Sequence, residues 1–151
     1  MNIKVTIVLL SLSTILFMGL YFFFNPSYQK SLQAKYYYEM SEYDEAYSHA
    51  KEAFGLDSYN RMAATIMAQS LISLKYVKYI NEAKKYMKQI DEIVNKEKIE
   101  DSDKAKIRLI CEIMKSSYIK LAPSVVTDKE LVESAAYYHT GFEQLLEKIN
   151  G

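Results

Sequence analysis

The chain has 151 residues, which is the size of one domain once any targeting segment is set aside. Nineteen lysines and arginines balance nineteen aspartates and glutamates, and this zero net charge argues against a nucleic-acid binder that relies on bulk positive charge. Four glycines and two prolines leave helices with few interruptions, and a single cysteine excludes a disulfide within the chain. We therefore expect an all-α fold.

The first feature in chain order is a long apolar run. Residues 5–24 contain no charged side chain, and about twenty apolar residues are needed for a helix to cross the hydrocarbon core of a membrane. The run ends in Tyr21 and three phenylalanines, the kind of side chain that favours the membrane interface, and Pro26 follows. The sequence predicts a single transmembrane anchor over 1–26 and a soluble domain over 27–151.

A cleaved signal peptide is the alternative interpretation of this run. Signal peptides have shorter apolar regions, of about 7–15 residues, that end at small residues near the cleavage site. Here the run ends in bulky aromatic residues, so an uncleaved anchor is favoured. The flanking lysines, Lys4 before the run and Lys30 and Lys35 after it, give little charge bias. A very short N-terminus usually stays in the cytoplasm, which predicts a bacterial inner-membrane protein whose C-terminal domain is periplasmic.

The rest of the chain has helical periodicity almost to its end. We expect six helices joined by short turns, which would form three antiparallel pairs, and no sheet. Gly55 is expected to end the second helix, Ser102 to cap the fifth, and Thr127 with Glu130 to form a capping box for the sixth. The expected helices cover about 27–40, 43–54, 58–74, 81–94, 102–121 and 128–149.

An internal repeat lies in this helical region. Tyr43-Asp44-Glu45-Ala46 is echoed by Tyr79-Ile80-Asn81-Glu82-Ala83, with the two alanines 37 residues apart. Ala53 then follows at a small-residue position, and Leu56-Asp57-Ser58-Tyr59-Asn60 closes the first copy. Small residues at fixed spacings allow two helices to cross closely.

These residues resemble the tetratricopeptide repeat (TPR), whose period is about 34 residues and whose closing motif is L-D-P-x-N. The resemblance covers about 70 residues, with one clear half-repeat and one degenerate copy, and residues 103–149 carry no repeat signature. It implies helical hairpins whose packing residues are Tyr43, Ala46, Ala53 and Ala83. It also implies a groove, lined by the first helix of each pair, that receives a peptide or an amphipathic helix. The groove positions that it assigns are Tyr28, Ser31, Lys35, Tyr38, Glu39, Met62, Thr65, Gln69, Ile72 and Ser73.

No catalytic or metal-binding pattern is found in the sequence. The two histidines, His49 and His139, lack the spacing of metal ligands, so we interpret both as helix-rim residues. Cys111 has no partnered histidine by motif and is expected to be a buried thiol. Nucleophile-elbow and phosphate-loop motifs are also missing, so we predict no catalytic residue, no cofactor and no enzyme activity.

Five lysines interleave with tyrosines in the middle of the chain: Lys75, Lys78, Lys84, Lys85 and Lys88, with Tyr76, Tyr79 and Tyr86. This pattern is compatible with a patch for anionic lipid or an acidic partner. Glu82, Asp91 and Glu92 dilute the positive charge, and a solvated helix face is the favoured interpretation.

The leading hypothesis is a membrane-anchored scaffold or chaperone that stabilises or assembles another membrane or envelope protein, in secretion or flagellar-motor machinery. Tethering raises the effective concentration of a membrane partner. Two alternatives remain: recognition through the transmembrane helix itself, with Ser11, Ser13, Thr14 and Gly19 at the contact, and a helical module that binds a lipid surface. So few repeats need a partner, or a second copy in a homodimer, to complete the core.

Overall fold

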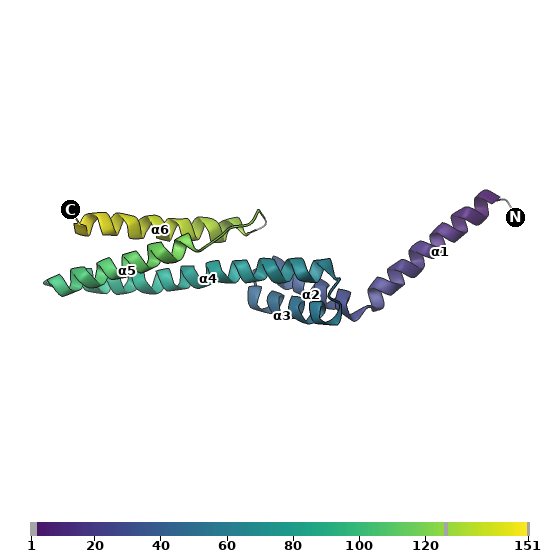
Figure 1. Ribbon diagram of the computed structural model, residues 1–151, viewed down its shortest axis with the longest axis horizontal. Coiled ribbons are helices and arrows are strands. Elements are labelled where there is room, and N and C mark those ends of the chain that lie inside the picture. The colour runs from purple at the N-terminus through teal and green to yellow at the C-terminus, as the bar shows by residue number, and fades with distance from the viewer. Residues whose placement is uncertain (1–2, 126, 151) are drawn as a thin grey trace. The chain divides into compact units, whose positions relative to one another are not determined.

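The computed structural model describes residues 3–125 and 127–150, and within them it contains six helices and no strand (Figure 1). The all-α prediction is therefore confirmed for the described residues. The helices are α1 (Ile3–Phe24), α2 (Pro26–Glu39), α3 (Tyr43–Leu56), α4 (Arg61–Val94), α5 (Asp101–Ile119) and α6 (Lys129–Asn150).

Helix α1 contains the apolar run and buries none of its residues within the structure. It is long and apolar enough to cross a membrane, although a signal sequence near an N-terminus meets the same test of length and composition. Two of its hydroxyl groups donate hydrogen bonds to backbone carbonyl oxygens of the same helix. The Ser11 hydroxyl donates to the carbonyl oxygen of Val8 at 2.9 Å, and the Thr14 hydroxyl donates to that of Leu10 at 2.8 Å.

The prediction of separate third and fourth helices is wrong, because residues 61–94 form the single 34-residue helix α4. Five helices, not six, therefore follow the apolar one. No glycine or proline interrupts this stretch, and buried positions recur at steps of three and four residues through Ser73, Tyr76 and Ala83. The second repeat copy, Tyr79–Ala83, thus lies inside a helix and not at an inter-helix turn.

Three predicted helix ends are also wrong. Helix α3 continues through Gly55 to Leu56, and Asp57 is its C-cap. Helix α5 is capped by Glu100, whose backbone N–H donates to the Asp103 carboxylate at 3.2 Å, and not by Ser102. Before α6, the Asp128 carboxylate accepts from the backbone N–H of Glu130 at 2.9 Å. The Thr127 hydroxyl instead accepts from the backbone N–H of Ser124 at 2.8 Å, so it stabilises the preceding loop.

The chain divides into two compact units, Met1–Ser70 and Leu71–Gly151, and the boundary falls inside α4. We call them the N-terminal and C-terminal units. In the N-terminal unit, α2 and α3 form an antiparallel hairpin: the start of α2 is bonded to the end of α3, with Ser27 Oγ donating to the Ala53 carbonyl oxygen at 2.8 Å. Further along the pair, Tyr37 of α2 stacks on His49 in the middle of α3, with ring centroids 5.1 Å apart.

A buried polar cluster joins this hairpin to the first turn of α4. The fully buried Asn60 amide donates to both Ser27 Oγ and Ser31 Oγ, each at 2.8 Å. Its side-chain oxygen accepts from the backbone N–H of Ala63 at 3.1 Å, as an N-cap residue does. One side chain therefore caps α4 and bonds to α2.

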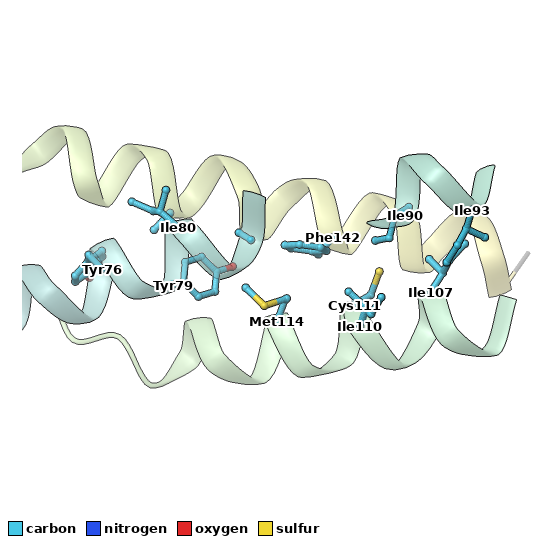
Figure 2. Close-up of a cluster of buried hydrophobic side chains, with 12 residues drawn as sticks. Tyr76, Tyr79, Ile80, Ile90, Ile93, Ile107, Ile110, Cys111, Met114 and Phe142 are labelled. Atoms are coloured by element: carbon cyan, nitrogen blue, oxygen red, sulfur yellow. The ribbon is translucent and has the colours of Figure 1, made fainter. Parts of the chain in front are cut away.

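The C-terminal unit is held by large apolar side chains. Figure 2 shows them gathered between the helices, with Phe142 of α6 among side chains of α4 and α5. Phe142, Met114 and Cys111 are fully buried. Helix α6 approaches α4 closely at Gly141, where an added Cβ would lie 2.8 Å from Met87 Cε.

Candidate binding groove

A surface groove of about 490 Å³ lies in the N-terminal unit, between the last turns of α2 and the first turns of α4. Side chains from the two helices alternate around it because residues three and four apart share a helix face. The lining residues are Lys35, Tyr38, Glu39, Arg61, Met62, Thr65, Ile66 and Gln69.

Six of the ten groove residues assigned by the TPR resemblance line this groove: Lys35, Tyr38, Glu39, Met62, Thr65 and Gln69. The other four lie elsewhere. Tyr28 packs edge-on against Phe22 with ring centroids 4.7 Å apart. Ser31 is fully buried in the Asn60 cluster. Ile72 and Ser73 belong to the C-terminal unit, where Ile72 packs against the apolar core and Ser73 is fully buried.

Sequence reasoning missed two lining residues, Arg61 and Ile66. A helical register would have found them, since Arg61 precedes Thr65 by one turn and Ile66 follows Met62 by one turn.

The groove combines an apolar floor with a charged rim. Ile66 is 6% exposed, and it packs with Tyr38 and Met62 against the alanines of α2 and α3. At the rim, Lys35 Nζ lies 3.7 Å from Glu39 Oε1, and both side chains are more than half exposed, so this ion pair contributes little stability. With Arg61, the lining carries one excess positive charge. An extended or helical segment with an apolar face and a negative end would be complementary to it.

All four residues assigned to repeat packing are buried. Ala46, Ala53 and Ala83 are fully buried, and Tyr43 is 5% exposed. Three of them lie in the N-terminal unit: Tyr43, Ala46 and Ala53. The fourth, Ala83, belongs to the apolar core of the C-terminal unit.

The two histidines and the cysteine, the side chains best suited to catalysis or metal binding, are packed against other side chains. Each histidine lies nearly parallel to a tyrosine ring: His49 on Tyr37, and His139 on Tyr118 at 4.0 Å between centroids. Cys111 is buried as predicted, and burial, together with the charge of Glu112, raises the pKa of its thiol. The structure brings no three histidine, cysteine or acidic side chains together as metal ligands within its described residues.

The lysines of the sequence patch are dispersed. Lys75 and Lys78 line a cavity of about 310 Å³ together with Glu82 and with Lys120, the C-cap residue of α5. Lys84 lines a different cavity, and Lys85 and Lys88 are simply exposed. This arrangement agrees with the favoured interpretation of a solvated helix surface.

No protein-family model, no curated protein and no solved structure matches this chain.

Proposed function

We propose that the protein is a membrane-anchored scaffold or assembly chaperone that holds a segment of another membrane or envelope protein in the α2–α4 groove. The observation that carries the proposal is that six of the ten residues assigned by the TPR resemblance line one groove of about 490 Å³. Volumes of this size are typical of specific binding sites. An apolar floor under a polar rim is the arrangement that recognises an amphipathic segment.

Helix α1 serves as the anchor in this proposal, with the rest of the chain on the periplasmic side. The junction after the apolar run supports retention of the helix. Asn25 alone separates α1 from α2, and its side-chain oxygen accepts from the backbone N–H of Ser27 at 2.9 Å. Gln29 Nε2 donates to the Phe23 carbonyl oxygen at 2.7 Å. Bulky aromatic residues in a hydrogen-bonded junction are a poor substrate for signal peptidase, which requires small residues.

Site-specific photocrosslinking in living cells tests the groove. A photoreactive phenylalanine analogue is placed at Gln69 in the full-length protein, and a matched probe is placed at Ser48, an exposed α3 position outside the groove lining. We expect one discrete adduct with a membrane or envelope protein from position 69 and none from position 48. Mass spectrometry of the adduct identifies the partner.

Substitutions then separate the groove from the anchor. Lys35→Ala with Gln69→Ala should abolish co-purification of the partner, whereas Glu45→Ala with Lys51→Ala, at exposed α3 positions, should leave it intact. Replacing residues 5–24 by an unrelated transmembrane helix should also leave it intact. Loss of the partner on helix replacement alone would contradict the groove proposal and assign recognition to α1.

A further inference from the structure

A second cavity, of about 670 Å³, lies in the C-terminal unit where α4 ends, α5 begins and α6 ends. It shares no residue with the α2–α4 groove. Figure 2 shows Ile90, Ile93 and Ile107 grouped at this end of the apolar cluster. The walls contain six aliphatic side chains and no aromatic ring: Ile90, Val94, Ile99, Ile107, Leu145 and Ile149.

The aliphatic walls run from the core to solvent. Ile90 and Ile107, at 2% and 4% exposure, form the floor, whereas Val94 and Ile99 remain 51% and 41% exposed. Covering exposed apolar area is favourable by about 25 cal/mol per Å². A flexible alkyl chain follows branched aliphatic walls more closely than a flat ring does, so the lining favours an acyl chain.

The polar residues that line the cavity determine which head group such a ligand can have. Lys104 and Lys148 line it, and no carboxylate of the described residues does. Lys148 forms no ion pair within residues 3–125 and 127–150, and Lys104 Nζ lies 3.6 Å from an Asp101 carboxylate that is fully exposed. The nearby Asp103 carboxylate is already paired with Lys96 at 2.6 Å. Two lysines in a lining that is otherwise mostly aliphatic are complementary to an anionic amphiphile.

We propose that this cavity binds a long-chain fatty acid, with the acyl chain along the aliphatic walls and the carboxylate between Lys104 and Lys148. The cavity volume falls in the range of about 300–1,000 Å³ of sites for one small ligand, which fits a single acyl chain. This site is independent of the α2–α4 groove, so either proposal can fail alone.

The test uses the full-length protein in nanodiscs of phosphatidylcholine, with palmitate that carries a photoactivatable diazirine in mid-chain as the probe. After irradiation, mass spectrometry maps the labelled peptides. We expect label in peptides that cover 90–107 and 145–150, beyond the label that α1 acquires from the bilayer. Unlabelled palmitate should compete, and hexadecanol, which has the same chain and no charge, should compete about tenfold less well.

Charge variants provide the control. Lys104→Gln with Lys148→Gln should reduce labelling of these peptides about fivefold. Lys84→Gln with Lys85→Gln removes the same charge at exposed positions outside the cavity and should leave labelling unchanged. Far-UV circular dichroism verifies that all variants are folded. Label confined to α1, equal competition by hexadecanol, or equal loss in both double variants would each overturn the proposal.

Discussion

The two compact units are built from different kinds of side chain. The N-terminal unit packs five fully buried alanines, Ala34, Ala46, Ala50, Ala53 and Ala63, and adds the buried hydrogen bonds of Asn60. The C-terminal unit packs isoleucines, tyrosines, Met114 and Phe142. Small residues let helix backbones approach closely, whereas large ones fill a wider space between helices. The units should therefore fail in opposite ways: the first when a core residue is enlarged, the second when one is shortened.

The largest effect is expected for Phe142→Ala in the C-terminal unit. Removing this fully buried ring leaves a cavity and should cost about 3–5 kcal/mol. Amide hydrogen exchange of the full-length protein should show loss of protection in α5 and α6, with α2 and α3 unchanged. Phe142→Leu, which retains part of the volume, should lose less. Equal loss of protection in α2 and α3 would mean that the two units unfold together. This result would contradict the view that each unit is stabilised by its own core.

Enlargement should damage the N-terminal unit. Ala50→Leu places a larger side chain in a site with no exposed surface and should cost about 1–3 kcal/mol through overpacking. Hydrogen exchange should then increase in α2 and α3. Ala68→Leu, at an exposed position of the same unit, should have no comparable effect. Unchanged protection in the Ala50 variant would show that close alanine contacts do not limit this core.

Disruption of the buried polar cluster around Asn60 should cause a somewhat smaller loss of stability. Asn60→Ala removes the α4 cap and two donated hydrogen bonds, and should cost about 1–2 kcal/mol. Faster exchange at the backbone N–H of Ala63 reports the loss of the cap. Asn60→Asp retains the acceptor for this N–H but no longer donates to the serines. It should therefore preserve protection at Ala63 while it loosens the contact between α4 and α2.

The smallest expected effect is the change in stability at high pH. Burial, with a contribution from Tyr118, raises the pKa of Tyr79 from its ordinary value of 10.0 to about 12. The folded state therefore holds this phenolic proton more tightly than the unfolded state does. Its contribution to stability is complete below pH 10 and is lost as the pH rises towards 12. The difference in tyrosinate absorbance between the parent and Tyr79→Phe should show one group titrating near pH 12. A group titrating near pH 10 would contradict the burial of this hydroxyl.

Most helix boundaries could be predicted from the sequence because their signals are local. The expected helices at 27–40 and 43–54 differ from α2 and α3 by one or two residues at their ends. Pro26 begins α2, and α5 ends shortly before Pro123. The failure at α4 came from treating Asn81 as a helix start, although no glycine or proline lies between Arg61 and Asn81. A polar residue on an exposed face is equally compatible with the middle of a helix.

The candidate groove was only partly predictable. Lys35 and Gln69 could be placed on it because they lie on helix faces whose register a motif supplies. Ser31 could not be separated from them, since its burial depends on Asn60, which lies 29 residues away in the chain. The fatty-acid cavity had no sequence signal, because its walls come from residues that span 90–150.

By itself, the sequence determined the apolar helix, the all-α class, most helix ends and the burial of Ala46, Ala53 and Cys111. These features follow from composition and from spacings of three or four residues, which act within one or two turns. Tertiary structure alone decided that Asn60 joins α4 to α2, that the core is divided into two units of different composition, and where the two cavities lie. Those features depend on side chains far apart in the chain, whose contacts exist only after the helices have packed.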